Sequence, residues 1–212
     1  MKRNTVQWAI ILKSCGVKPT QVLTWAPIFA DVVSDKSFSM GDAEIDIFLG
    51  QILHESGMLT LMEENLNYSV DRIVQLGNAS PVGSRWRSLV PIAATIARNP
   101  QAMANAVYGG RLGNVAPTDG WLYRGSGPIQ VTGKANFASL AKVTGLPLVA
   151  NPGLLRTPTK EALLVCIAWW EGHVPDCNMC SPRKVRKNVN GGDFGLTETT
   201  RIAGLAKTAM TA

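Results

Sequence analysis

The chain has 212 residues, which is long enough for one domain with a substantial core or for two small lobes. Hydrophobic residues make up 46% of it and charged residues 17%, a balance that excludes wholesale disorder. The formal net charge of +6 points to an anionic partner such as a nucleic acid, a membrane surface or a bacterial envelope.

The periodicity of the apolar residues predicts helices over most of the chain. The first is expected at about Thr5–Ser14 and the second at about Pro19–Val33. Asp42 is expected to cap a third helix, which runs to about Ser56, where Gly57 offers a natural end.

A long irregular segment is predicted in the middle of the chain. The region 84–108, rich in Ala and Arg, predicts one or two helices broken near Pro100. Residues 109–133 hold seven glycines and two prolines, so they predict a loop with at most a small hairpin. Helices are expected again further on, at about 134–143, at about 160–172 and on both sides of the turn signal Asn190–Gly192. The chain is therefore predicted to be mainly α, and without repeats or long linkers it forms one domain.

The N-terminus carries no convincing targeting signal. Met1-Lys2-Arg3 is followed by a short apolar patch, Trp8–Leu12, which Lys13 interrupts. No stretch approaches the roughly 18 apolar residues of a membrane span. We therefore expect synthesis in the cytoplasm without a signal peptide, and a substrate outside the membrane would require another factor for release.

The basic run and the cysteines favour structural roles. The run Arg183–Lys187 has little aromatic interleaving, which favours a solvated helix face over a nucleic-acid site. Cys15 and Cys166 lie in apolar stretches and are expected in the core. Cys177 and Cys180 form a CxxC that could be a disulfide, a redox pair or half of a zinc site. No second CxxC or HxxxH accompanies it, so no metal site is predicted.

The third predicted helix carries a carboxyl group on an otherwise apolar face. Ile45, Phe48, Ile52 and Glu55 are spaced by three, four and three residues and therefore form one stripe. A carboxyl at the end of a core-facing stripe is partly desolvated, which favours the protonated form that a general acid needs. The alternative is a buried glutamate paired with an arginine, and the stripe alone leaves both open.

A second carboxylate within reach of Glu55 would favour a catalytic role for Glu55 over a structural one. In an unbroken helix Glu64, nine residues further on, would point about 180° away from Glu55. Because Gly57 is expected to end the helix, the chain can fold back and bring Glu64 to face Glu55 across a groove. Inverting glycosidases hold two carboxyls about 6.5–9.5 Å apart, with room for a water. On spacing alone, Glu63 competes with Glu64 for the second position.

Four motifs, in this order, closely resemble glycoside hydrolase family 19, which contains plant-type chitinases and bacteriophage endolysins. They are HESG at His54–Gly57, ENLNYS at Glu64–Ser69, YRGSGPIQVTGKANF at Tyr123–Phe137 and VNGG at Val189–Gly192. The matching region covers about residues 40–205, and its spacing is most like that of the compact endolysins. The resemblance implies a lysozyme-like helical domain with two lobes and a cleft. It also implies that residues 1–212 form a single catalytic domain without a separate wall-binding module.

The resemblance implies roles for particular residues. Glu55 matches the general acid, Glu64 the general base of an inverting mechanism, and Thr132 a hydroxyl that helps to hold the attacking water. The residues expected to bind the sugar or border its cleft are Gln130, Asn136, Asn190, Tyr123, Tyr68 and Arg201. Of these, Arg201 matches a C-terminal basic residue that the family has near the acid–base network. Amide side chains suit this role because they both donate to and accept from sugar hydroxyl and N-acetyl groups. The two tyrosines could line the cleft or pack its wall, and no metal or cofactor is implied.

The chain departs from the family in one glycine-rich loop. Family members commonly have an arginine between the two glycines, where this chain has Ser126, while Arg124 lies two residues earlier. The departure bears on substrate preference more than on the reaction. His54 points about 100° away from Glu55 and is expected to be a structural hydrogen-bonding group. Trp121, in the long loop, is a candidate for stacking on a sugar.

Three functions remain to be separated. The leading hypothesis is an endolysin that hydrolyses the β-1,4 bonds of the peptidoglycan backbone for host cell lysis, acting in the cell wall after release. A chitinase acting on N-acetylglucosamine polymers is the same-fold alternative, although plant-type chitinases usually carry a secretion signal and several disulfides. A glycan-binding protein with a dead site is disfavoured because Glu55, Glu64 and Thr132 are all present. The expected partner is peptidoglycan or a related aminosugar polymer, with no nucleic acid, no membrane insertion and no stable oligomer.

Overall fold

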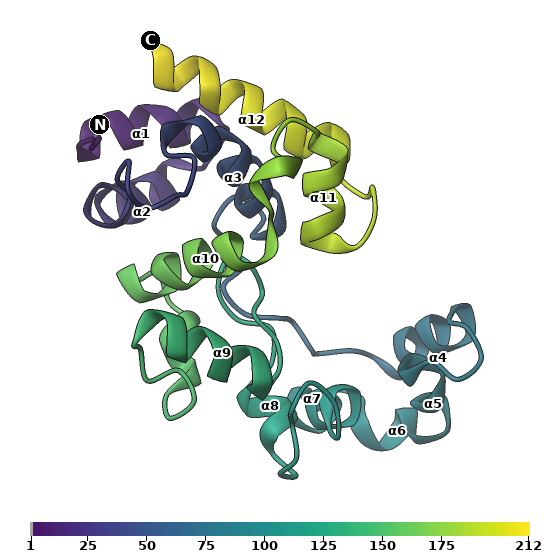
Figure 1. The fold of residues 1–212 in the computed structure, drawn as a ribbon. Helices are drawn as coiled ribbons and strands as arrows, with labels where there is room; N and C mark the ends of the chain where they lie inside the picture. Colours follow the sequence, from purple (N-terminus) through teal and green to yellow (C-terminus); the bar gives the residue numbers. More distant parts are fainter. Residues whose placement is uncertain (1) are drawn as a thin grey trace.

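The computed structural model describes residues 2–212, which fold into helices arranged in two lobes (Figure 1). Two separate clusters of buried apolar side chains form the cores of these lobes. Within the described residues there is no β-strand, only isolated bridges. The prediction of a mainly α chain is therefore confirmed.

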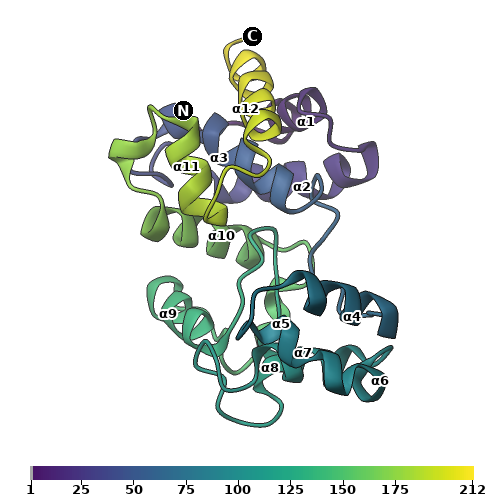
Figure 2. The ribbon, with the colours of Figure 1, turned by 90° about the vertical axis from the view of Figure 1, so that its right-hand side faces the viewer.

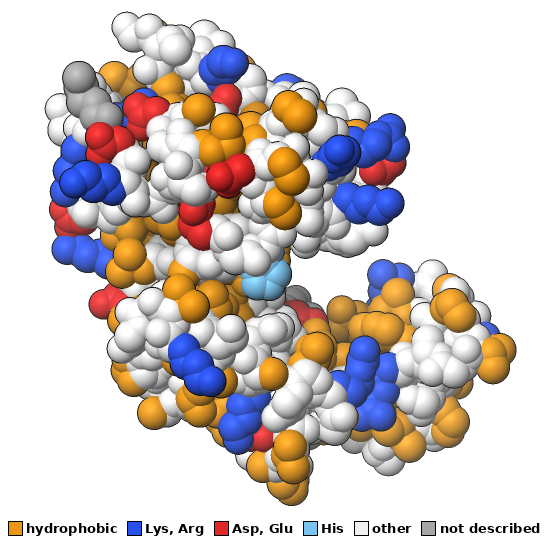
Figure 3. Space-filling view, in the orientation of Figure 1, with side chains coloured by type: hydrophobic (Ala, Val, Ile, Leu, Met, Phe, Trp, Pro, Cys, Tyr) orange, Lys and Arg blue, Asp and Glu red, His pale blue; other side chains and the backbone are white. Residues whose placement is uncertain are grey.

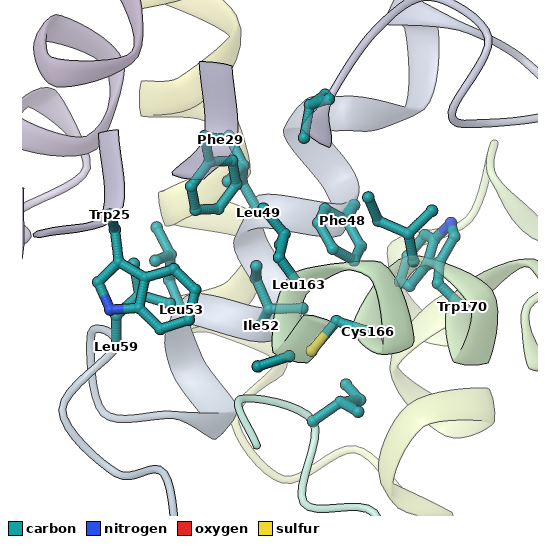
Figure 4. Close-up of a cluster of buried hydrophobic side chains, with 14 of the residues drawn as sticks. Trp25, Phe29, Phe48, Leu49, Ile52, Leu53, Leu59, Leu163, Cys166 and Trp170 are labelled. Carbon is teal, nitrogen blue, oxygen red and sulfur yellow. The ribbon is translucent and has the colours of Figure 1, made fainter. Parts of the chain in front are cut away.

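The large lobe is built around α3, the helix that ends in Glu55. It contains α1 (Thr5–Ser14), α2 (Pro19–Val32), α3 (Asp42–Glu55), α10 (Lys160–His173), α11 (Pro182–Asn190) and α12 (Leu196–Thr211). Figure 4 shows side chains of α2, α3 and α10 meeting in its core, among them Phe29, Phe48 and Trp170. The apolar stripe of α3 is buried as predicted, since Ile45, Phe48 and Ile52 are each at most 1% exposed.

The start of α3 differs from the prediction that Asp42 caps it. The N-cap is Gly41, which has no side chain to cap with, and Asp42 is the first helical residue. The Asp42 carboxylate instead accepts hydrogen bonds from both terminal nitrogens of Arg3, each 3.1 Å long. An acidic group in the first turn still favours the helix, because it lies at the positive end of the helix dipole.

The small lobe consists of short helices. They are α4 (Val70–Ala79), α5 (Arg85–Ser88), the 3-10 helix η1 (Val90–Ile92), α6 (Ala93–Ile96) and α7 (Pro100–Tyr108). The sequence prediction missed α4, although Ser69 caps it by accepting a 3.2 Å hydrogen bond from the Arg72 amide. The region 84–108 is broken more often than predicted, because Pro91 as well as Pro100 lacks an amide hydrogen.

The middle of the chain connects the two lobes. It contains α8 (Asp119–Leu122), α9 (Lys134–Thr144) and η2 (Pro152–Leu155), whereas η3 (Asp176–Asn178) lies between α10 and α11. The prediction that residues 109–133 hold no helix is wrong for α8, a single turn that packs on α7. Gly120 permits this packing, because a Cβ there would lie 2.7 Å from the Ala104 carbonyl oxygen. The expected hairpin is reduced to one bridge, Ser126 with Val131.

A deep hollow separates the lobes. The views in Figures 1 and 2 place α11 and α12 on one side of it and α4–α7 on the other. Figure 3 shows that the hollow stays open when side chains are drawn, with Lys and Arg on both sides of its mouth. The chain first crosses between the lobes in the segment from α3 to α4. No helix in the described part of the chain is long and apolar enough to cross a bilayer.

Candidate active site

Glu55 is the last residue of α3, and the chain reverses direction directly after it. Ser56 ends the helix by donating a 2.6 Å hydrogen bond to the Ile52 carbonyl and accepting one of 2.8 Å from the Leu59 amide. Gly57, Met58 and Leu59 have φ angles of 54°, 61° and 63°. A left-handed backbone costs a residue other than glycine about 1–2 kcal/mol, and such strain is often found at functional sites. The predicted break at Gly57 is confirmed.

A buried arginine holds the Glu55 carboxylate. Arg186 of α11 is 2% exposed, and its Nη2 lies 2.6 Å from Oε1 of Glu55, which is 26% exposed. The same guanidinium donates to Gln51 Oε1 at 2.9 Å and, through Nε, to the Phe194 carbonyl at 2.6 Å. Glu55 is therefore the arginine-paired glutamate of the second alternative, although its side chain still reaches solvent.

Backbone pairing places Glu64 beside the glycine-rich loop. The Glu64 amide donates to the Gly125 carbonyl at 3.0 Å, and the Gly127 amide donates to the Met62 carbonyl at 2.8 Å. The next residues turn back in the one-bridge hairpin 126–131. Glu64 and Gly125, which are 61 residues apart in the sequence, are thereby fixed as neighbours.

Neutral donors hold the Glu64 carboxylate. The Tyr108 hydroxyl lies 2.7 Å from both carboxylate oxygens, and the Gly125 amide lies 3.3 Å from Oε2. Burial, followed by the charge of the adjacent Glu64, raises the pKa of Tyr108, so the phenol stays protonated and remains a donor. The sequence reasoning missed Tyr108, because no spacing links the end of α7 to Glu64.

Glu63 is engaged elsewhere, which separates it from Glu64. Its Oε1 accepts from Nε and Nη2 of Arg124 at 2.8 and 2.5 Å, and Arg124 is only 7% exposed. Arg124 also donates to the Trp121 carbonyl and stacks on the Trp121 ring, 3.5 Å from its centroid. The ion pair gives Glu63 a structural role and leaves Glu64 as the carboxylate with neutral partners.

Replacing Glu63 by glutamine is expected to weaken the fold while leaving the reaction intact. The Glu63→Gln variant removes the charge that pairs with buried Arg124, which should lower the free energy of unfolding by about 1–3 kcal/mol. We expect kcat to stay within about threefold of wild type, because Glu64 keeps its own donors. Urea unfolding and reducing-end release measure the two effects. A kcat loss as large as that of Glu64→Gln would show that the base has been assigned to the wrong residue.

Gln130, Thr132 and Asn136 are linked by a chain of hydrogen bonds that begins at the glycine-rich loop. Gln130 has a φ of 56°, and its side chain donates to the Gly127 carbonyl at 2.9 Å. Thr132 Oγ1 donates to the Gln130 carbonyl at 2.9 Å, and Asn136 Nδ2 donates to the Thr132 carbonyl at 2.8 Å. The structure thus brings these three predicted residues together.

Gly125 allows Gln130 and Glu64 to approach each other. A Cβ on Gly125 would lie 2.7 Å from Gln130 Oε1 and 3.1 Å from the Glu64 Cβ. No side chain fits there without moving a polar group of the site. The adjacent Ser126 is fully buried, and its hydroxyl accepts a 3.1 Å hydrogen bond from Arg156 Nε. Arg156, from a distant part of the sequence, is therefore the cation that contacts residue 126, where the family commonly has an arginine.

Asn190 supports the arginine that holds Glu55. Its Nδ2 donates to the Phe194 carbonyl at 2.8 Å, and its Oδ1 accepts from the Gly192 amide at 2.9 Å. The same Phe194 carbonyl accepts from Arg186. In this structure the amide of Asn190 organises the turn after α11. His54 packs against the same turn, since a Cβ on Gly195 would lie 2.3 Å from its Nε2.

The remaining predicted residues lie in different environments. Tyr123 is 4% exposed and packs in the large core, with its hydroxyl donating to the Val149 carbonyl at 3.0 Å. Tyr68 is half-buried in the small lobe, edge-on to Trp86. The expectation that Arg201 lies near the acid–base network is wrong, because its guanidinium pairs with Glu198 on the exposed face of α12. The arginine at Glu55 is Arg186.

Removing the Tyr108 hydroxyl is expected to slow the reaction. Tyr108→Phe deletes the only phenol that donates to Glu64 among residues 2–212, so we expect kcat to fall about 10–100-fold with KM nearly unchanged. Tyr123→Phe is the matched control, because it also deletes a phenol hydrogen bond, to Val149, and should lower the melting temperature without changing kcat. Equal kcat values for the two variants would contradict a positioning role for Tyr108.

The cysteines and the described carboxylates form no metal centre. All four cysteines are free, and no group of three His, Cys, Asp or Glu residues within 2–212 could hold an ion. Burial raises the pKa of the Cys15 thiol to about 11 and that of Cys166 to about 12, which makes both thiols unreactive. Cys177 and Cys180 are exposed, and the Cys180 thiol contacts the Cys177 carbonyl at 3.8 Å.

Known proteins resemble this chain in sequence and in fold. No protein-family model matches it. A glycosyl hydrolase family 19 domain-containing protein of Haemophilus influenzae is 34% identical over 163 residues, 74% of each chain. Rice chitinase 8 (Oryza sativa subsp. japonica) is 37% identical over 59 residues, 26% of this chain and 23% of that protein.

The solved structure of chitinase C from Streptomyces griseus HUT6037 has a TM-score of 0.54 at 16% identity, and the match covers 98% of this chain and 77% of that chain. A mutant of chitinase C gives the same TM-score at 15% identity, over 97% of this chain and 92% of that one. These matches confirm the predicted fold. Together with the 34% identity over three quarters of the Haemophilus protein, they show that this chain is a glycoside hydrolase of family 19.

Proposed function

We propose that the chain is an endolysin that hydrolyses β-1,4 bonds of the peptidoglycan backbone by an inverting mechanism. The observation that supports it most is the contrast between two carboxylates at the junction of the lobes. Glu55 is fixed by a buried arginine, whereas Glu64 is held by a phenol and a backbone amide. Two carboxyls in different environments suit an acid and a base that act in the same step.

Glu55 acts as the general acid. Glu55, which reaches solvent, takes up a proton before the step and gives it to the oxygen of the leaving sugar as the bond between that oxygen and the anomeric carbon breaks. Proton transfer leaves a negative charge on Glu55, which the adjacent Arg186 guanidinium offsets. The partial exposure of Glu55 lets the substrate reach its carboxyl group.

Glu64 acts as the general base. It takes a proton from a water that attacks the anomeric carbon on the opposite face of the sugar. Thr132, whose hydroxyl already donates to the Gln130 carbonyl, keeps its lone pairs free to accept a hydrogen bond from this water. Tyr108 and the Gly125 amide fix the carboxylate so that one direction of attack is favoured.

Charge favours peptidoglycan over chitin, although the relatives named as chitinases support a chitinase equally well. Residues 64–122 carry five arginines against three carboxylates, and α11 adds Lys184 and Lys187 besides Arg183 and Arg186, which are paired with Asp193 and Glu55. Peptidoglycan carries carboxylates on its stem peptides, whereas chitin is uncharged. We further propose that the enzyme is made in the cytoplasm, acts in the cell wall after release by another factor, and functions as a monomeric single domain.

Digestion of purified Gram-negative peptidoglycan, with chitin oligosaccharides in parallel, tests this function. We expect new reducing ends from peptidoglycan, and mass spectrometry of the muropeptides identifies which sugar carries them. Cleavage of chitin alone would establish the chitinase alternative. Binding to cell walls without release of reducing ends would establish a non-catalytic glycan-binding protein.

A further inference from the structure

A polar pocket of about 340 Å³ opens on the small lobe, directly after the catalytic base in the sequence. Its lining consists of Asn65, Asn67, Tyr68, Ser69, Arg72 and Arg98. Four of these residues continue the chain from Glu64, so the pocket adjoins the proposed cleavage site. None of the six is acidic.

Electrostatics link the pocket to Glu64. Burial and then the charge of Glu64 raise the pKa of Tyr68, while the charge of Arg72 opposes this shift. The ring of Tyr68 therefore lies within reach of both the base and the pocket cation. A group bound beside Arg72 would sit next to a sugar held over Glu64.

Neither arginine of the pocket is neutralised. Arg72 donates to the neutral Gln75 side chain at 2.6 Å, and Arg98 has no side-chain partner among residues 2–212. Elsewhere in the protein, Arg124 and Arg186 are each paired with a carboxylate. The pocket thus presents two guanidinium groups without a carboxylate partner among the described residues, and the guanidinium is the group that binds carboxylates with paired hydrogen bonds.

The backbone holds Arg98 at the pocket. Arg98 has a φ of 57°, in the left-handed region that glycine and asparagine tolerate best. Its amide donates a 2.8 Å hydrogen bond to the Tyr68 carbonyl, which ties the loop before α7 to the lining segment. The position of this arginine is therefore set by the fold.

We propose that this pocket binds a carboxylate of the substrate, carried by the stem peptide on the lactyl group of muramic acid. The two guanidinium groups would bind the carboxylate, and the side chains of Asn65, Asn67 and Ser69 would bind the peptide amides around it. An uncharged N-acetylglucosamine chain offers no such group. The inference rests on the proposed function and makes the pocket the part of the site that selects peptidoglycan.

Removing the charges of the pocket tests the proposal. The double variant Arg72→Gln/Arg98→Asn keeps polar side chains and a residue that accepts the left-handed backbone. Arg87→Gln, an exposed arginine of the same lobe outside this pocket, is the matched control. The substrates are native peptidoglycan and the same material with its carboxylates converted to neutral amides by carbodiimide and methylamine.

We expect the double variant to lose about tenfold in kcat/KM on native peptidoglycan and to equal wild type on the amidated material. Wild type and Arg87→Gln should both lose about tenfold when the substrate is amidated. Full activity of the double variant on native peptidoglycan, or an equal loss on both substrates, would overturn the proposal while the function stands. Failure of wild type to release reducing ends from either material would instead overturn the proposed function, and this inference with it.

Discussion

Replacing Glu55 by glutamine is expected to lower kcat on the order of 1,000-fold, because an amide cannot give a proton to the leaving oxygen. Glutamine keeps the size of the side chain and an oxygen that can accept from Arg186. The effect should fall on kcat rather than on KM, since the substrate loses only the proton donor. Release of reducing ends from purified peptidoglycan measures it directly.

The stability of the Glu55→Gln variant has to be measured beside its activity. The change leaves the buried Arg186 charge without its carboxylate, so some destabilisation is expected although Gln51 and Phe194 still accept from it. Glu63→Gln is the matched control, because it also removes the carboxylate of a buried arginine. If the Glu55→Gln variant clears permeabilised Gram-negative cells as fast as wild type does, Glu55 is not the general acid.

Replacing Arg186 by methionine is expected to lower both stability and rate. The guanidinium holds Glu55, Gln51 and the Phe194 carbonyl together, and methionine fills the volume without any donor. Loss of one partner of a buried ion pair lowers the free energy of unfolding by about 3–5 kcal/mol. We expect about 3 kcal/mol here, because Glu55 reaches solvent. For a chain of this length, that corresponds to a melting temperature lower by roughly 6–12 °C.

The rate effect of Arg186→Met has a separate cause. Without the guanidinium, the charge that forms on Glu55 during proton transfer is not offset, so kcat should fall about 10–100-fold at temperatures where the variant is folded. Lys187→Met removes a positive charge from the neighbouring, exposed position of α11, and it should change neither kcat nor the melting temperature. In the double variant Glu55→Gln/Arg186→Met, the loss in free energy of unfolding should be smaller than the sum of the losses in the two single variants. Additive losses would contradict a direct coupling between the two residues.

The sequence predicted α3 and its end well, because both depend on local patterns. The apolar spacing of Ile45, Phe48 and Ile52 indicates a buried face, and Gly57 suits a left-handed turn. Boundaries that depend on a neighbouring segment were less predictable. Asp42 was expected to be a cap, whereas Arg3, far away in the sequence, binds its carboxylate and leaves Gly41 in the cap position.

Contacts between distant segments could not be predicted from spacing. Backbone hydrogen bonds between segments 61 residues apart place Glu64 beside the glycine-rich loop. No pattern of side chains in the sequence signals this pairing. The same limit explains why Arg186 was expected on a solvated helix face and Arg201 near the acid–base network. Both are basic residues near the C-terminal turn, and only the packing of α11 against α3 decides which one reaches Glu55. Tyr108 was missed for the same reason.

The stereochemistry of the first product tests the two-carboxylate mechanism most directly. ¹H NMR can follow the anomeric configuration at the new reducing end while soluble, uncross-linked glycan strands of peptidoglycan are cleaved, before the product equilibrates. Direct attack by a water that Glu64 activates inverts the β-linked carbon, so we expect the α-anomer to form first. Initial formation of the β-anomer would contradict this mechanism, because retention requires two successive displacements at the anomeric carbon and a different role for Glu64.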